Sequence, residues 1–319
     1  MPKVAYTTNG FFGPFESING ASDLELPWPF LVWSAISVGR AELIHIIRYR
    51  EFSLFEIAFR AAMLFANLCE DGSGRIRRSE AYDGLDPSEK GAISYFLGLM
   101  FAKGFAERVL GVPWLMHLDV YRQELRPMVL GRSRPDLVGQ TTSGEWVAIE
   151  AKGRTSNFDW KALERAKQQA QMLATVGGQE PVLRIGMVTH FDSNRLEFTA
   201  TDPLSDESHE RIHLSLTRQR LFEGYYRPFR TWLSNNPQAD MIEIAGVVYR
   251  AAPVGNVDVT VGLSTNMMDD NFAASPSVGQ QHAENEKRYA GSDGVLVELG
   301  PRWSTQNMTR EPQQRTDTA

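Results

Sequence analysis

The chain has 319 residues, of which 42% are hydrophobic and 23% are charged, which is ordinary for a globular protein of one large or two modest domains. Its formal net charge of −6 argues against a broad basic surface that grips nucleic acid, although a local basic groove is compatible with it. The single cysteine, Cys69, excludes a disulfide within one chain, and the scattered histidines form no ligand cluster for structural zinc.

Targeting and membrane segments are not expected from the sequence. Residues 1–15 lack the apolar segment of a secretory signal. The most apolar early run, residues 28–38, falls well short of the roughly 20 residues that a membrane helix needs. We therefore expect a soluble, cytoplasmic protein with no membrane partner.

Residues 1–82 are predicted to form a helical N-terminal region. Turn dipeptides fill residues 1–27, and we interpret the phenylalanines among them as anchors of a surface arm, with base stacking as the alternative. Apolar residues at helical spacing predict a helix within residues 40–68, with one face buried. The Arg-Ile-Arg-Arg cluster at residues 75–78 is interpreted as a solvated loop, with a phosphate contact as the alternative.

Residues 83–203 are predicted to form the core of the protein. The predicted elements are a helix at 87–110 capped by Asp86, strands at 114–122, within 128–140 and at 145–152, a helix at 159–175, and strands at 182–190 and 195–201. A strand reached through a crossover helix indicates a parallel or mixed sheet covered by helices. Gly98 and Gly104 each destabilise the first helix by roughly 1 kcal/mol relative to Ala, so we expect close packing at both positions.

Residues 204–302 are predicted to add a helix and several strands, and residues 303–319 a disordered tail. Arginines alternate with aromatic residues in the predicted helix at 214–233, which Pro228 should end or kink. We interpret these aromatic side chains as core-facing, with binding of nucleic acid or a protein partner as the alternative. The predicted strands lie at 241–251, 257–263 and 294–299.

The candidate site lies in the central stretch, where Asp136 is near one strand end and Glu150 and Lys152 are two residues apart on the next strand. Two carboxylates brought close together repel each other, and a hard divalent cation such as Mg²⁺ relieves that conflict. Such an ion polarises a phosphoryl oxygen and lowers the pKa of bound water. The ammonium of Lys152 can orient or deprotonate that water, or stabilise negative charge on the phosphate.

The alternative interpretation of these residues is structural. Asp136 then caps a turn, and Glu150 and Lys152 form an exposed ion pair worth under about 1 kcal/mol. Trp146 and Ala148 lie on the same strand face as Glu150, which indicates that this face is partly covered and favours the site.

Pro135-Asp136, followed after residues 137–149 by Glu150-Ala151-Lys152, resembles the motif of the PD-(D/E)XK nuclease superfamily. The predicted order of elements is also similar to the core of that family, and the resemblance covers about residues 86–201. It implies a restriction-endonuclease-like α/β fold with a mixed central sheet flanked by helices. It also implies that Asp136, Glu150 and the main-chain carbonyl of Ala151 hold the metal, and that Lys152 is the catalytic amine.

Two further positions follow from the resemblance alone. Members of the family often add an acid from the first core helix, for which Glu89 and Glu107 are both open. Many place a glutamine on the helix after the Glu-x-Lys strand, for which Gln168 is the candidate and Gln171 lies one turn on. The Gln-x-x-x-Tyr form of one branch is absent from this sequence, so that branch is not supported.

The resemblance implies a Mg²⁺-dependent endonuclease, with Mn²⁺ able to substitute, that hydrolyses phosphodiester bonds in DNA; cleavage of RNA stays open. A role in restriction or phage defence is an analogy to the family. The alternative is a catalytically silent nuclease fold that serves as a binding or scaffold subunit, with a protein partner or further copies of the chain. The sequence has neither a phosphate-binding loop of the ATPase kind nor a Gly-x-Ser-x-Gly elbow.

Overall fold

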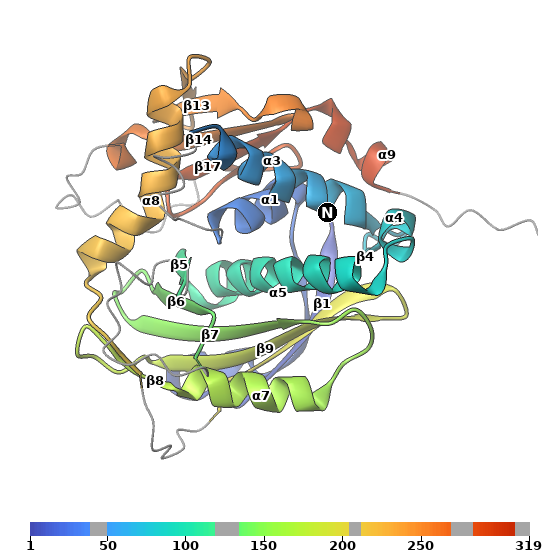
Figure 1. The fold of residues 1–319 in the computed structure, drawn as a ribbon, viewed down its shortest axis with the longest axis vertical. Helices are drawn as coiled ribbons and strands as arrows, with labels where there is room; N and C mark the ends of the chain where they lie inside the picture. Colours follow the sequence, from blue (N-terminus) through green and yellow to red (C-terminus); the bar gives the residue numbers. More distant parts are fainter. Residues whose placement is uncertain (39–49, 119–133, 204–211, 269–282, 310–319) are drawn as a thin grey trace, which may run out of the picture.

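A computed structural model describes residues 1–38, 50–118, 134–203, 212–268 and 283–309. Within these residues the chain is a mixed α/β protein with a nine-stranded sheet that carries helices on both faces. A second, six-stranded sheet lies beyond the helices of one face (Figure 1). The predicted mixed central sheet with flanking helices is therefore confirmed.

The large sheet combines strands of the predicted core with strands of the N-terminal region. Its strands are β1 (Lys3–Asn9), β2 (Gly20–Glu25), β3 (Leu68–Glu70), β4 (Ile76–Arg78), β5 (Trp114–His117), β6 (Leu137–Gln140), β7 (Trp146–Gly153), β9 (Leu183–Asp192) and β10 (Arg195–Thr201). They are arranged in the order β2-β1-β10-β9-β7-β6-β5, with β3 and β4 attached beside β10. β7 is parallel to β9 and β1 is parallel to β10, whereas the other pairs are antiparallel.

The N-terminal arm is part of this sheet, which corrects the prediction of a turn-rich surface arm. The turn dipeptides mark the ends of two short strands: Gly10 has φ +75° after β1 and Gly20 has φ +124° at the start of β2. Phe11 is buried against Phe105, as expected for an anchor, while Phe12 is exposed. The sheet thus crosses the boundary predicted between residues 82 and 83.

Helices cover both faces of the sheet, with α5 on one side of β7 and β9 and α7 on the other (Figure 1). The helices are α1 (Trp28–Ser37), α3 (Arg50–Asn67), α4 (Glu80–Asp83), α5 (Pro87–Leu110), α7 (Trp160–Gln171), α8 (Arg218–Asn235) and α9 (Thr305–Met308), with short 3-10 turns η1 (Gly13–Ile18), η2 (Gly255–Val257), η3 (Thr265–Met267) and η4 (Pro301–Trp303). The predicted cap of α5 is confirmed, because the Asp86 carboxylate accepts hydrogen bonds from the amides of Ser88 and Glu89.

Several predicted elements differ in length. The helix expected at 159–175 ends at Gln171, and the β-branched and apolar residues after it form β8 (Leu173–Val176), which pairs with β11 (Ile212–Leu214). The start of the helix predicted at 40–68 and parts of the strands predicted at 114–122 and 128–140 lie outside the described residues.

Close approach between α5 and the end of β7 explains the glycines in that helix. A Cβ at Gly98 would lie 2.9 Å from the amide nitrogen of Gly153, and a Cβ at Gly104 would lie 3.1 Å from the Phe30 ring. A Cβ at Gly153 would clash with the carbonyl oxygen of Ser94. The expectation of close packing at Gly98 and Gly104 is confirmed, and the contact places the middle of α5 beside the last residues of β7.

The C-terminal sheet is built from antiparallel strands. They are β12 (Asp240–Ile244), β13 (Val247–Pro253), β14 (Val259–Ser264), β15 (Ala283–Glu284), β16 (Arg288–Ala290) and β17 (Val295–Leu299). The strand predicted at 241–251 is in fact the hairpin β12-β13, whose turn has positive φ at Ala245 and Gly246. The tail predicted from residue 303 is wrong for residues 303–309, since Trp303 and Met308 are buried; residues 310–319 lie outside the described residues.

The arginine-rich helix α8 packs its aromatic side chains inward. Phe222, Tyr225, Tyr226, Phe229 and Trp232 are all buried, so the core-facing interpretation is confirmed. The helix continues past Pro228 to Asn235 instead of ending there. One apolar cluster includes Val4, Phe101 and Val261, and therefore joins the N-terminal, core and C-terminal regions. None of the described helices combines the length and the apolar character that a membrane-spanning segment requires.

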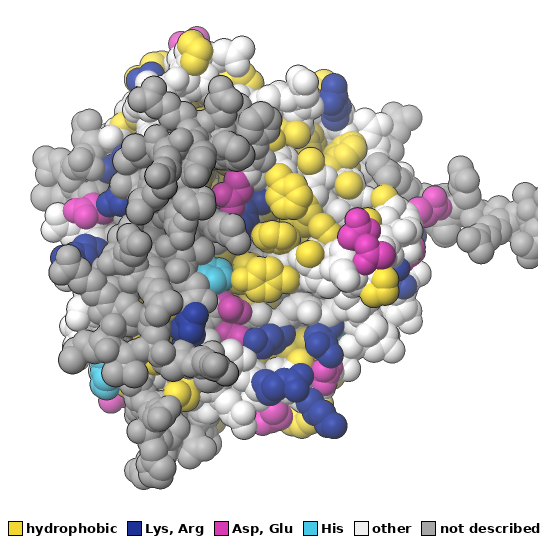
Figure 2. Space-filling view, viewed as in Figure 1, with side chains coloured by type: hydrophobic (Ala, Val, Ile, Leu, Met, Phe, Trp, Pro, Cys, Tyr) yellow, Lys and Arg dark blue, Asp and Glu magenta, His cyan; other side chains and the backbone are white. Residues whose placement is uncertain are grey.

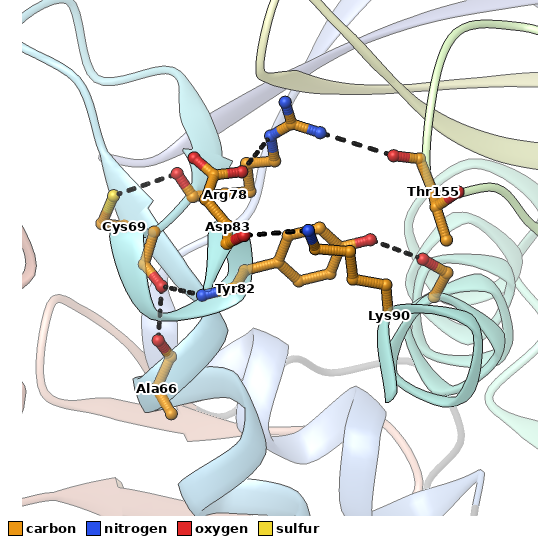
Figure 3. A network of polar contacts seen from close by, with 9 residues as sticks. Ala66, Cys69, Arg78, Tyr82, Asp83, Lys90 and Thr155 are labelled. Atoms are coloured by element: carbon orange, nitrogen blue, oxygen red, sulfur yellow. Dashed lines mark hydrogen bonds and ion pairs between the residues drawn. The ribbon is translucent and has the colours of Figure 1, made fainter. Parts of the chain in front are cut away.

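The basic cluster at residues 75–78 is structured, which corrects the prediction of a solvated loop. Figure 3 shows Arg78 of β4 bonded to the Asp83 carboxylate at 2.8 Å and to the Thr155 carbonyl at 3.4 Å. In the same network Tyr82 is hydrogen-bonded to Ser94 of α5 at 2.9 Å. These contacts tie α4 to α5 and to the segment that follows β7.

Candidate active site

The structure brings Asp136 and Glu150 together at neighbouring strand ends. Asp136 immediately precedes β6, and Leu137 of β6 lies opposite Ile149 of β7. The amide of Asp136 donates a hydrogen bond to Glu150 Oε2 at 2.8 Å, and the amide of Ala151 donates one to Asp136 Oδ2 at 3.2 Å. Each carboxylate is therefore oriented by the main chain of the other strand.

Burial gives this carboxylate pair unusual electrostatics. Glu150 is 0% exposed and Asp136 is partly buried. Burial raises the pKa of Glu150, and the negative charge of Asp136 raises it further. Burial also raises the pKa of Asp136, while the charges of Lys152 and His117 oppose that shift. Ionising both groups costs a large free energy unless positive charge lies close to them.

Lys152 supplies positive charge from the same strand face as Glu150. Its ammonium Nζ contacts Glu150 Oε1, and its side chain is partly exposed whereas that of Glu150 is fully buried. The alternative of an ordinary exposed ion pair therefore does not describe this site. Lys152 therefore reaches from the protein surface to a fully buried carboxylate.

The main chain of Ala151 also faces Asp136. Its amide donates a hydrogen bond to the Asp136 carboxylate. In an extended strand the amide and the carbonyl of one residue point to the same edge, so the Ala151 carbonyl is directed to the side on which Asp136 lies. Two carboxylates and one carbonyl are thereby gathered at one strand edge.

Tyr95 and His117 complete the surroundings of Asp136, and sequence reasoning assigned neither of them a role. The Tyr95 hydroxyl is hydrogen-bonded to Nε2 of His117 at 2.9 Å. His117 ends β5 opposite Leu137, and the amide of Leu118 donates to the Asp136 carbonyl at 2.7 Å. The polar position of His117 in an alternating strand was visible in the sequence, but the register that sets it beside Asp136 was not.

The two acids considered on α5 lie elsewhere in the structure. Glu89 belongs to the start of the helix, where its carboxylate accepts from the Asp86 amide at 3.1 Å. Glu107 belongs to the contact with the C-terminal sheet, where it accepts from Ser292 at 2.7 Å and from Tyr289 at 3.2 Å. Among the described hydrogen bonds, neither side chain joins Asp136 or Glu150, and α5 presents Tyr95 to the site in their place.

Gln168 lies on the exposed side of α7. The next residue, Gln169, donates from its amide group to the carbonyl of Arg134 at 3.4 Å. Gln169 of α7 therefore contacts the segment preceding Asp136. The role of Gln168 stays a prediction, and its alternative, Gln171, is the last residue of α7.

The donor set at the site fits a hard cation. Within the described part of the chain, no group of three or more histidine, cysteine or acidic side chains is gathered as a metal site. Mg²⁺ does not require such a group, since it uses one or two carboxylates and retains several waters. Asp136 and Glu150 with the Ala151 carbonyl match that preference.

No family model, no curated protein and no solved structure matches this chain.

Proposed function

We propose that this chain is a metal-dependent nuclease of the PD-(D/E)XK kind that hydrolyses phosphodiester bonds in DNA. The observation that supports the proposal most directly is the meeting of Asp136 and Glu150 across β6 and β7, with the ammonium of Lys152 against Glu150. This is a carboxylate pair with one amine at the ends of paired strands, which suits phosphodiester hydrolysis.

The chain's own residues divide the work of the proposed reaction. Asp136, Glu150 and the Ala151 carbonyl would hold Mg²⁺ or Mn²⁺, which when bound polarises the phosphoryl oxygen and lowers the pKa of water. Lys152 is placed to orient the attacking water or to stabilise negative charge developing on the phosphate. His117, hydrogen-bonded to Tyr95, brings a second ionisable group near enough to Asp136 to act on its charge.

One observation favours the scaffold alternative. The carboxylate of Glu150 is already paired with Lys152, and both carboxylates accept hydrogen bonds from main-chain amides. The pair can therefore be satisfied by the protein alone, as in a fold that binds without turnover. The two functions differ in whether a divalent cation binds at Asp136 and Glu150 and stabilises the folded protein.

Cleavage of supercoiled plasmid in Mg²⁺ or Mn²⁺ tests the proposal. We expect nicking by the wild type and a loss of about 100-fold or more in Asp136→Asn, which keeps an acceptor oxygen but removes the charge. Asp240→Asn, at an exposed aspartate of β12, is the matched control and should cleave normally. Lys152→Arg accompanies Lys152→Ala, because removing the counter-charge of the buried Glu150 carboxylate can unfold the chain.

Thermal unfolding separates the two functions. Binding of the cation to the folded state should raise the melting temperature of the wild type and of Asp240→Asn but not of Asp136→Asn. Cleavage that survives Asp136→Asn removes the site assignment. A wild type that neither cleaves nor is stabilised by the cation contradicts the nuclease proposal and favours the scaffold.

A further inference from the structure

The surface around Asp136 has an aromatic side and a basic side. Figure 2 shows a hydrophobic patch over α3 and α5, a histidine and acidic side chains at the edge of that patch, and a group of Lys and Arg side chains over α7 beyond them. We define the aromatic patch as Phe59, Tyr95 and Phe96. We define the basic group as Lys152, Arg154, Lys161, Arg165 and Lys167.

The aromatic patch is connected to the candidate site by direct contacts. The rings of Phe59 and Phe96 meet edge-on with centroids 5.8 Å apart, and those of Phe96 and Tyr95 are also 5.8 Å apart. Tyr95 then bonds to His117 beside Asp136. Phe59 is 50% exposed and Tyr95 is 42% exposed. Because Phe59 has no hydrogen-bonding group, its exposed ring face can gain only from apolar or stacking contact.

The basic group has the opposite character. Arg165 is 61% exposed and Lys161 is exposed, one helical turn apart on α7. Asp159 pairs with Arg154 at 2.5 Å and lies 4.0 Å from Arg165, so one acid is shared by two guanidinium groups. Lys152 is paired with Glu150, and Lys167 with Glu164 at 2.8 Å. The exposed Lys161 and Arg165 therefore carry the excess of positive charge on this side of the site, in a chain whose net charge is −6. Such an arrangement suits the phosphates of a nucleic acid.

The aromatic side offers no matching place for phosphates in the described contacts. Among the described residues, Arg60 is the cation that lies against it, with its guanidinium 5.3 Å from the centroid of the Phe96 ring. Arg60 is buried and bonded to Glu56 and to the Ala35 carbonyl, so it is not directed to a ligand. A duplex laid across the site would present backbone phosphates to both sides, and among the described residues only the α7 side offers exposed cations for them.

We propose that the substrate enters this site as single-stranded DNA, with its phosphates along the basic group and its unpaired bases on the aromatic patch. The assignment rests on the proposed nuclease function and names its substrate class. In a duplex the faces of the bases are covered by their neighbours, whereas in a single strand each base has a face that can stack on an aromatic side chain. The rings of Phe59, Phe96 and Tyr95 lead to His117, whose charge acts on Asp136, so stacked bases would fix the register of the phosphate to be cleaved.

Fluorescence anisotropy in EDTA measures binding without cleavage. The probes are a labelled DNA single strand of about 15 nucleotides, the same strand in a duplex, and an RNA of the same sequence. We expect the wild type to bind the DNA single strand most tightly. Phe59→Ala should weaken that binding about fivefold or more and leave duplex binding unchanged. Phe12→Ala removes a ring that is 56% exposed on the N-terminal arm and is the matched control, which should bind as the wild type does.

A second variant tests the basic group. Arg165→Gln should weaken binding of all three probes and reduce the slope of log affinity against log salt concentration by about 1, because one phosphate contact is lost. An unchanged slope with unchanged affinity overturns the placement of phosphates along α7.

The failure of this inference is distinguishable from failure of the proposed function. Duplex binding as tight as single-strand binding, tighter binding of RNA, or no effect of Phe59→Ala overturns it, whatever the plasmid assay gives. A dimer of the wild type that Phe59→Ala dissociates in sedimentation also overturns it, since the patch then joins two copies of the chain. Single-strand binding that needs Phe59, without cleavage in any divalent metal, removes the proposed catalysis and keeps the binding assignment.

Discussion

At the scale of single residues, several carboxyl groups of this protein have pKa values that burial raises, and they differ in their partners. Burial raises the pKa of Glu150 and of Asp136, which lie together at the candidate site. Burial also raises the pKa of Asp202, at the end of β10, to about 6. There the amide of Arg184 donates to the carboxylate at 2.9 Å, and this bond and the charge of Arg184 only partly offset the effect of burial. Asp202 lies outside the candidate site, so its titration reports on stability alone.

Asp202→Asn should flatten part of the dependence of stability on pH. A carboxyl group whose pKa is raised by folding stabilises the folded state below its unfolded pKa of about 4, and this contribution is lost as the pH rises through about 6. Asparagine keeps an oxygen for the Arg184 amide and does not titrate. In urea unfolding we expect the variant to gain about 1–2 kcal/mol over the wild type at about pH 7 and nothing at about pH 4. A gain of equal size at both pH values contradicts this account.

Among the secondary-structure elements, the contact of α5 with β7 positions the site. Gly98 and Gly153 allow the helix to approach the strand end that carries Glu150 and Lys152. The same approach brings Tyr95 to His117. A side chain at either glycine forces the two elements apart, and the cost falls both on the packing and on the geometry around Asp136.

Gly98→Ala should destabilise the protein by about 1–3 kcal/mol although alanine is the better helix former. Its Cβ would lie 2.9 Å from the Gly153 nitrogen, which is too close for ordinary contact. Gly91→Ala in the same helix is the matched control: no atom lies within 4 Å of its added Cβ, so a gain of about 0.5–1 kcal/mol is expected. Denaturant unfolding measures both, and stabilisation by both substitutions would show that α5 can shift freely.

The sequence determines elements better than it determines their contacts. Asp86 and the apolar spacing after it predicted α5, and the separation of Asp136 from Glu150 led to the paired strand ends that the structure contains. The place of His117 opposite Leu137 depends on strand register, and the contact of Gln169 with Arg134 depends on which side of α7 faces that segment. Neither is encoded in local spacing. The strands β1 and β8 were missed because turn residues and a preceding helical pattern dominate their short sequences.

At the scale of the whole molecule, a buried polar cluster joins the C-terminal sheet to the core. Asp293 lies between β16 and β17, is fully buried, and accepts hydrogen bonds from Tyr225 of α8 at 2.5 Å and from Trp33 of α1 at 3.1 Å. Lys103 of α5 donates to the same Tyr225 hydroxyl at 3.1 Å. Burial raises the pKa of Asp293 to about 6 and lowers that of Lys103 to about 8, while the opposite charge of each group opposes the shift of the other.

Asp293→Asn should therefore destabilise the whole molecule by about 2–4 kcal/mol. The asparagine NH2 group, itself a donor, would face the donors of Tyr225 or Trp33, and the buried Lys103 would lose its counter-charge. Lys103→Met fills similar volume without charge and should also destabilise, by leaving Asp293 uncompensated. Because the two charges stabilise each other, the double variant should lose less than the sum of the single losses, with a coupling of about 0.5–3 kcal/mol. Unfolding in urea, followed by tryptophan fluorescence, measures the cycle. Strictly additive losses, or a C-terminal sheet that unfolds in a separate transition, would mean that the apolar cluster alone holds the sheet in place.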